Sequence, residues 1–161
     1  MRRLEKTIRE IGWTHAVPRL SVEDRVARAF DQMSREAHDC VLVMRGAALA
    51  GIFTSRDFLN RVAAVRADPA AILLGSVMTE APRTLRPRDP VAFAINWMAI
   101  EGFRNVPIID DNGDVLGALT VWDVMRHIGE IFDDIDATPR PTPPGGDTSS
   151  VIAMIDLGGG S

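Results

Sequence analysis

The feature that most constrains this chain is an internal repeat. Residues 51–57 read Gly-Ile-Phe-Thr-Ser-Arg-Asp, and residues 117–123, which lie 66 positions later, read Gly-Ala-Leu-Thr-Val-Trp-Asp. In both copies a short apolar run ends at the threonine, and apolar residues at helical spacing follow it. Two copies of one structural unit predict a body of two similar halves, residues 1–132, related by a pseudo-twofold axis.

The first half is predicted to begin with an extended piece and an amphipathic helix. Val26, Ala29, Phe30 and Met33 share one helical face, and Ser21 is the expected N-cap. Two short apolar runs then predict buried strands, and a second helix follows the Gly-x-x-Thr-x-x-Asp motif. The elements expected after the first helix are strands over residues 41–44 and 49–53 and a helix from residue 55 to about 65.

The second half repeats this order. An apolar helical face over residues 91–98 matches that over residues 26–33 at an offset of 65, so we expect a one-residue insertion between helix and strand. Asp89 is expected to cap this helix, with Pro90 as its first residue and Gly102 at its end. The remaining elements are strands over residues 106–109 and 115–119, a hairpin turn over 110–113 and a helix from 121 to about 131.

Fold class and domain boundaries follow from this repeat. Each half has the order strand-helix-strand-strand-helix, which belongs to the α/β class, and neither half is large enough to be comfortably stable alone. Two halves packed as a pseudo-twofold α/β sandwich would bury one shared core. The expected segments are an N-terminal helix over 1–11, a first repeat over 12–66, a linker and second repeat over 67–132, and a flexible acidic tail rich in proline and glycine over 133–161.

Charge and composition exclude several classes of function. The formal net charge is −4, and residues 133–161 contain five aspartates against one arginine, so residues 1–132 are neutral by count. A neutral body lacks the basic face that nucleic-acid binding needs. The single cysteine, Cys40, allows no intrachain disulfide, and no apolar run is long enough to span a membrane. We expect a cytoplasmic protein that binds neither nucleic acid nor membrane.

The Gly-x-x-Thr-x-x-Asp motif has two interpretations. A strand that turns into a helix leaves backbone N–H groups at the helix start, where they can bind an anion, and the aspartate can accept hydrogen bonds from ligand hydroxyls. Each junction is therefore a candidate site for a compound with phosphate and diol, and the glycine three residues before the threonine favours this interpretation. Thr-x-x-Asp before a helix is also a capping box, in which Thr54 or Thr120 bonds the helix start and the aspartate bonds back.

Other reactive side chains lack the spacing of a catalytic or metal site. The three histidines show no metal-ligand spacing with Cys40 or with one another, and Cys40 begins an apolar strand, which indicates a core residue. The chain has no Ser/His/Asp arrangement and no glycine loop of the Walker type. We expect that it is not an enzyme and requires no cofactor. Arg56 and Arg104 are candidates to neutralise a phosphate.

The ordered set of motifs resembles a tandem pair of CBS (cystathionine-β-synthase-type) domains, called a Bateman module. The resemblance covers roughly residues 12–132 and rests on the two Gly-x-x-Thr-x-x-Asp copies, on Gly-Ser-Val-Met-Thr over 75–79 and on Gly-Phe-Arg-Asn-Val-Pro-Ile-Ile-Asp over 102–110. It implies an α/β sandwich of two CBS-type repeats, with clefts that bind AMP, ADP, ATP or S-adenosylmethionine.

The resemblance also assigns ligand roles to individual residues. It implies that Asp57 and Asp123 contact the ribose and that Thr54 and Thr120 lie near the phosphate. Groups near Val17, Pro18, Pro82 and Thr84 would flank the base. Trp122 would either line the cleft or pack against neighbouring side chains. We rank Asp123 first, because the second copy keeps a fuller motif with Arg104 and Pro107. One occupied site is as consistent with the sequence as two.

Two functions remain consistent with the sequence. The first is a regulatory module that senses an adenosine-containing ligand and signals to a partner protein. The second is a ligand-free oligomerisation or interaction module with the same fold. Apolar residues on the helices, including Phe58, Phe93 and Trp97, exceed what one shared core needs. Together with the resemblance, whose members often pair into flat dimers, they predict a homodimer formed through the helices of both halves.

Overall fold

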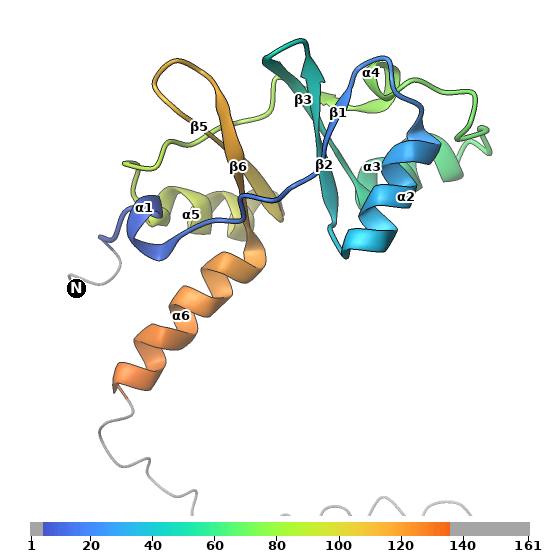
Figure 1. The fold of residues 1–161 in the computed structure, drawn as a ribbon. Coiled ribbons are helices and arrows are strands. Elements are labelled where there is room, and N and C mark those ends of the chain that lie inside the picture. The colour runs from blue at the N-terminus through green and yellow to red at the C-terminus, as the bar shows by residue number, and fades with distance from the viewer. Residues whose placement is uncertain (1–4, 136–161) are drawn as a thin grey trace, which may run out of the picture.

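The computed structural model describes residues 5–135, which form two similar halves lying side by side (Figure 1). The first half contains a four-stranded sheet in the order β1-β2-β3-β4, in which β1 is parallel to β2 and the other neighbours are antiparallel. The second contains the antiparallel pair β5-β6. The strands are β1 (Arg19–Ser21), β2 (Cys40–Arg45), β3 (Ala48–Thr54), β4 (Thr79–Glu80), β5 (Asn105–Ile109) and β6 (Val115–Thr120).

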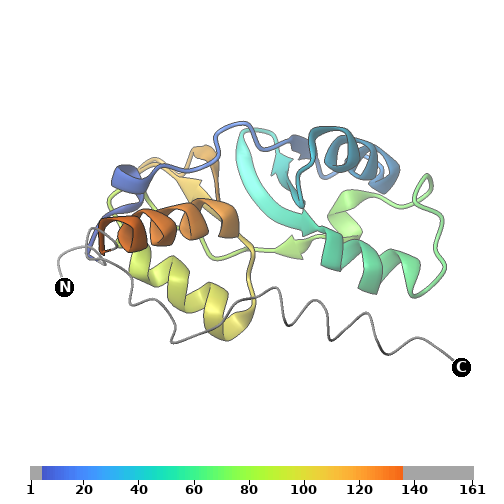
Figure 2. The ribbon, with the colours of Figure 1, turned by 90° about the horizontal axis from the view of Figure 1, so that it is seen from below.

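Each half has its own pair of long helical segments, which the view from below separates clearly (Figure 2). The first half has α2 and α3, and a π-helical turn over Leu59–Ala63 extends α3; the second half has α5 and α6. The predicted α/β arrangement of two tandem repeats is thereby confirmed. The helices are α1 (Ile8–Ile11), α2 (Val26–Glu36), α3 (Ser55–Phe58), α4 (Leu74–Val77), α5 (Val91–Glu101) and α6 (Val121–Ile135).

Each half donates an extended segment to the sheet of the other. We call residues 13–18 and 78–83 the lead-in segments, because each precedes the first strand or equivalent strand of its own half. Thr79 of the second segment pairs antiparallel with Ile52 of β3, and Thr14 of the first bridges Ala118 of β6 in the same way. The halves therefore cannot separate without breaking both sheets. The apolar cluster between them contains Val17, Cys40, Leu42, Ile52, Val115 and Ala118.

The strand registers locate the one-residue insertion that distinguishes the two halves. Cys40 pairs with Thr54 in the first half and Asn105 pairs with Thr120 in the second. The strands β2 and β5 are therefore still 65 residues apart, whereas β3 and β6 are 66 apart. The expected position between helix and strand is wrong: the extra residue lies in the β5–β6 hairpin, where a turn accommodates it without shifting any strand face.

Two helices begin later than predicted, because each expected cap closes a turn before the helix. Ser21 ends β1, and its backbone N–H donates to Asp24 Oδ2 at 2.7 Å, so α2 starts beyond this turn. Asp89 Oδ2 likewise accepts from the backbone N–H of Arg86 at 2.7 Å. Pro90 is then the N-cap of α5, not its first residue.

The short helix α1 belongs to the repeat, because it has a counterpart in α4. Ile8 of α1 packs in the core of the second half, and Leu74 of α4 packs in the core of the first, so these two short helices occupy equivalent places. Gly102 ends α5 in the left-handed conformation (φ 72°), as predicted.

The α6 helix continues to Ile135, beyond the expected end. The start of the predicted N-terminal helix and most of the predicted tail, residues 1–4 and 136–161, lie outside the described residues.

Candidate functional site

The Gly-x-x-Thr-x-x-Asp motif forms a capping box in both halves. Thr54 donates its backbone N–H and its hydroxyl to Asp57 Oδ2 (2.9 and 3.0 Å), and the backbone N–H of Asp57 donates to Thr54 Oγ1 (3.3 Å). Thr120 and Asp123 make the same three bonds at 2.9, 2.9 and 3.2 Å. Because a threonine hydroxyl has one proton, and the aspartate receives it, the threonine positions the carboxylate and does not offer that proton to a ligand.

A second threonine, in the lead-in segment, also donates to each carboxylate. Thr79 Oγ1 donates to Asp57 Oδ1 at 3.2 Å, and Thr14 Oγ1 donates to Asp123 Oδ2 at 3.1 Å. Each aspartate thus ties the start of its helix to the lead-in segment of the other half. Neither lead-in threonine was among the expected ligand residues, although their separation of 65 residues matches the repeat and is the signal that could have found them.

The repeated glycine allows the lead-in segment to approach this closely. A Cβ built on Gly51 would lie 2.5 Å from Met78 Sδ and 2.6 Å from the backbone oxygen of Thr79, and one on Gly117 would overlap the backbone oxygen of Thr14. Real Cβ atoms do not come this near to other atoms, so no other residue fits without a shift of the backbone. The glycine therefore serves the packing of the motif and is not by itself a sign of a ligand.

The two carboxylates differ in the cation beside them. Arg126 Nη2 donates directly to Asp123 Oδ1 at 3.1 Å. In the first half the nearby cation is one position further along the helix: Arg61 Nη1 stays 3.5 Å from Asp57 Oδ1, because it donates to the backbone oxygens of Val77 (2.9 Å) and Met78 (2.7 Å). Asp57 therefore retains more capacity to accept a ligand hydroxyl than Asp123.

Asp57 opens into a cleft between the halves, with a volume of about 670 Å³. This volume lies within the range of small-molecule sites, roughly 300–1,000 Å³. One wall is α3 with the π-helical turn, the second is the lead-in segment from Thr79 to Arg83, and the third is the segment from Gly102 to Pro107 that enters β5. Five of the predicted ligand residues line it: Thr54, Arg56, Asp57, Pro82 and Arg104.

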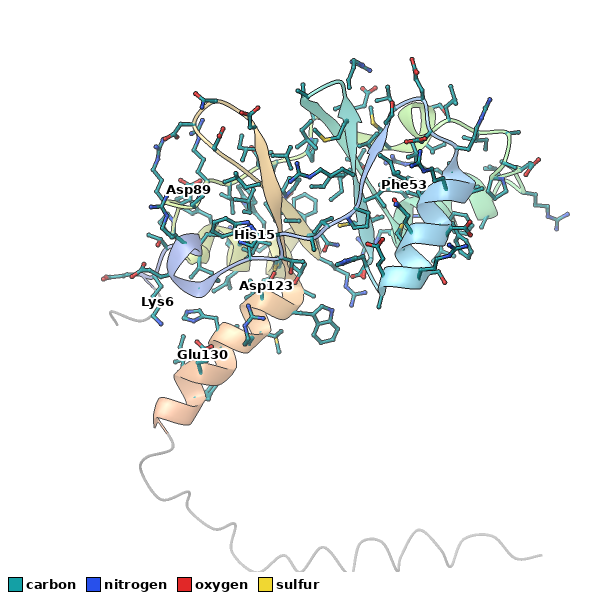
Figure 3. The ribbon with its side chains drawn as sticks, viewed as in Figure 1. Lys6, His15, Phe53, Asp89, Asp123 and Glu130 are labelled. Carbon is teal, nitrogen blue, oxygen red and sulfur yellow. The ribbon has the colours of Figure 1, made fainter. Side chains whose placement is uncertain are left out.

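The other predicted residues lie away from this cleft. Asp123 is only 4% exposed and stands at the end of α6 that adjoins β6 (Figure 3). Its neighbour Trp122 is 68% exposed, so it does not pack within its own half. The remaining residues of this group are Thr120 and Thr84, which are partly buried, and Val17 and Pro18, which are buried.

Arg104 and Pro107 face the opposite half from the one the sequence indicated. Their position in the second repeat predicts that they accompany Asp123, but both line the cleft of Asp57. The reason is the pseudo-twofold packing, which sets the start of β5 in the second half opposite α3 in the first. Local sequence reasoning also missed Asn60 and Arg61, which line the cleft one helical turn after Asp57.

Cys40 is a core residue, as predicted. It is buried at the start of β2, and burial, with a smaller contribution from the charge of Asp39, raises the pKa of its thiol to about 12. The thiol is therefore protonated at neutral pH and is not a nucleophile.

Residues 5–132 contain no group of three or more histidine, cysteine, aspartate or glutamate side chains placed to hold a metal ion. No helix within the described range combines the length and the apolar character needed to cross a membrane.

Comparison with known proteins identifies relatives of both halves. A model of the CBS domain family matches residues 8–64 and again residues 74–130, together more than half of the chain. The Meiotically up-regulated gene 70 protein of Schizosaccharomyces pombe is 30% identical over 118 residues, which is 69% of this chain but 16% of that protein. The chain thus spans less than a fifth of this curated relative.

Two solved structures share the fold at low sequence identity. The CBS domain protein PAE2072 from Pyrobaculum aerophilum, complexed with AMP, has a TM-score of 0.68 and 18% identity, covering 80% of this chain and 99% of its own. The CBS domain pair of protein MJ0100, in complex with 5-methylthioadenosine and S-adenosyl-L-methionine, has a TM-score of 0.67 and 20% identity, covering 77% and 100%. At this identity the likeness establishes the fold.

Proposed function

Because the chain belongs to the CBS domain family and carries two tandem copies of that domain, we propose that it is a regulatory module whose Asp57 cleft binds an adenosine-containing ligand. The observation that carries this proposal is the cleft of about 670 Å³ that brings Asp57, Arg56 and Arg104 together from two halves. Pairs of the same fold in complex with AMP or with S-adenosyl-L-methionine support the ligand class. No catalytic role is proposed.

In this proposal Asp57 accepts a hydrogen bond from the ribose diol of the ligand. An ionised carboxylate offers about four lone-pair sites, and Asp57 Oδ2 already accepts two hydrogen bonds from Thr54. Oδ1 accepts one from Thr79, which leaves a site for a ligand hydroxyl. Thr54 acts as a positioning residue, and Pro82 offers an apolar surface for the base. We therefore rank Asp57 above Asp123, in reverse of the order that the sequence suggested.

Binding of a ligand would be signalled to a partner protein by a change in the relative placement of the two halves. The walls of the cleft come from both halves, so a ligand that contacts α3 and the segment before β5 favours one relative placement of the two. A ligand shifts such an equilibrium only by its difference in affinity for the two placements. The regulated partner is proposed to read this placement.

We also propose that the module is a homodimer formed through its helices. Phe93 on α5 is 52% exposed, and Phe30, Met125 and Phe132 are similarly exposed on other helices. Phe58 and Trp97, which we had also expected at the interface, are partly buried against their own cores. Large apolar side chains that stay exposed on the helices of both halves are the basis for proposing this contact with a second copy. Light scattering at micromolar concentration should give twice the mass of the chain, and the mass of one chain would contradict the proposal.

A thermal-shift panel tests whether any adenosine compound binds. A ligand at 100 times its dissociation constant stabilises the folded state by about 2.7 kcal/mol, which should raise the melting temperature by roughly 10 °C for a body of this size. At least one of AMP, ADP, ATP and S-adenosylmethionine should do so at millimolar concentration, whereas CTP, which lacks the adenine base, should not. An unchanged melting temperature with every compound would instead support the second candidate, a ligand-free interaction module. The capping boxes are consistent with that candidate, because they give the repeated motif a structural role without a ligand.

A further inference from the structure

The cleft of Asp57 contains four arginines that the equivalent positions of the other half lack. Arginines 56, 61, 83 and 104 all line it, against the acidic residues Asp39, Asp57 and Glu80. The repeat, with the offsets that the strand registers establish, carries each arginine to a different residue type. The equivalent residues are Trp122 for Arg56, His127 for Arg61, Pro18 for Arg83 and Asp39 for Arg104. At these four positions the repeat acts as an internal control, and the arginine of the other half, Arg126, stands instead at the place of Asn60 and already donates to Asp123.

Two of these arginines are already engaged with the protein. Arg61 donates to the backbone oxygens of Val77 and Met78, and so it supports the wall of the cleft. Arg83 forms an ion pair with Glu101, and its guanidinium lies 5.2 Å from the centre of the Trp97 ring. Their positive charges remain near the cleft, but their donors are mostly used.

The other two, Arg56 and Arg104, have donors to offer. Arg56 is exposed on α3, and among the described side chains it has no ion-pair partner; its Nη1 would lie 3.6 Å from a Cβ added to Gly102, so the guanidinium rests against the backbone there. Arg104, also exposed, has only a distant contact, 3.8 Å from its Nε to Asp39 Oδ2. One comes from the first half and the other from the second, on opposite walls of one cleft.

We propose that the Asp57 cleft selects adenosine ligands that carry phosphate over those that carry a sulfonium group. This inference rests on the proposed function. A phosphate attached to a ribose held by Asp57 can accept charge-assisted hydrogen bonds from Arg56 and Arg104, whose planar donor groups suit phosphate oxygens. The sulfonium of S-adenosylmethionine would instead be repelled by the like charges of Arg56 and Arg104. A phosphate that contacts both arginines also bridges the two halves. The ligands that the cleft prefers would therefore be those that change the relative placement of the halves.

Titration calorimetry on the full chain, with ATP, AMP, adenosine and S-adenosylmethionine, tests this selectivity. ATP and AMP should bind at least about tenfold more tightly than adenosine or S-adenosylmethionine, by the usual strength of hydrogen bonds to charged groups. Arg56→Ala and Arg104→Ala should each weaken nucleotide binding by about tenfold and leave adenosine binding nearly unchanged. Arg88→Ala is the matched control, because Arg88 pairs with Asp111 away from the cleft and should not alter binding of any of the four.

The outcomes separate this inference from the function on which it rests. Equal affinity for S-adenosylmethionine and ATP, or an equal loss of adenosine and ATP binding in the arginine variants, would overturn the selectivity while the adenosine site stands. Failure of all four compounds to bind would overturn both. Stronger salt dependence for ATP than for adenosine would support the role of the arginines, since only the charged contact is screened.

Discussion

Gly51→Ala should destabilise the protein by about 3 kcal/mol, although it adds only one methyl group. The new Cβ would lie 2.6 Å from the backbone oxygen of Thr79, which cannot move without breaking the pairing of Thr79 with Ile52. Overpacking of this kind costs about 1–3 kcal/mol, and losing the bond from Thr79 to Asp57 adds about 1 kcal/mol. Since domains of this size are stable by roughly 5–15 kcal/mol, the loss should be plain in a urea titration followed by circular dichroism.

Gly129→Ala is the matched control for this substitution. Gly129 lies in α6, and a Cβ added there would meet no atom within 4 Å. The same methyl group should therefore stabilise the protein by about 0.5–1 kcal/mol, because alanine favours the helix over glycine. If Gly51→Ala were as stable as the parent, the lead-in segments would not be held as closely as the structure shows, and the glycine would need another explanation.

Local features of the fold were predictable from the sequence because they depend on residues close together in the chain. The spacing of apolar residues located all the long helices and strands, and Thr-x-x-Asp correctly indicated a capping box at residues 54–57 and 120–123. Where the sequence failed locally, the expected capping side chain accepts a hydrogen bond within a short turn instead: Ser21 Oγ accepts from the backbone N–H of Glu23, and Asp89 Oδ2 accepts from that of Arg86.

The candidate site could be predicted only in part, because it forms between the halves. The sequence grouped Thr54, Arg56 and Asp57, which share one short helix start and line the same cleft. It could not place Arg104 opposite them, since that contact depends on how the two halves pack and has no local signal. The exchange of lead-in segments could not be predicted for the same reason, even though Thr14 and Thr79 occupy equivalent positions of the repeat.

Asp57→Asn should weaken binding of adenine nucleotide by about ten- to a hundredfold, which corresponds to roughly 1.5–3 kcal/mol for a hydrogen bond to a charged group. Asparagine keeps an oxygen that can accept the two bonds from Thr54, so the capping box should survive. With the amide oxygen toward Thr54, the NH₂ group replaces Oδ1, the oxygen with a site left for a ribose hydroxyl, and the negative charge is lost. A melting temperature close to that of the parent would show that the loss is one of binding and not of folding.

Titration calorimetry of ATP into Asp57→Asn and Asp123→Asn, beside the parent, tests the central claim most directly. The two variants make the same change in equivalent capping boxes, but only Asp57 lines the cleft between the halves. We predict that Asp57→Asn loses at least about tenfold in affinity and that Asp123→Asn binds as the parent does. Parental affinity in Asp57→Asn, or a larger loss in Asp123→Asn, would contradict the assignment of the ligand to this cleft.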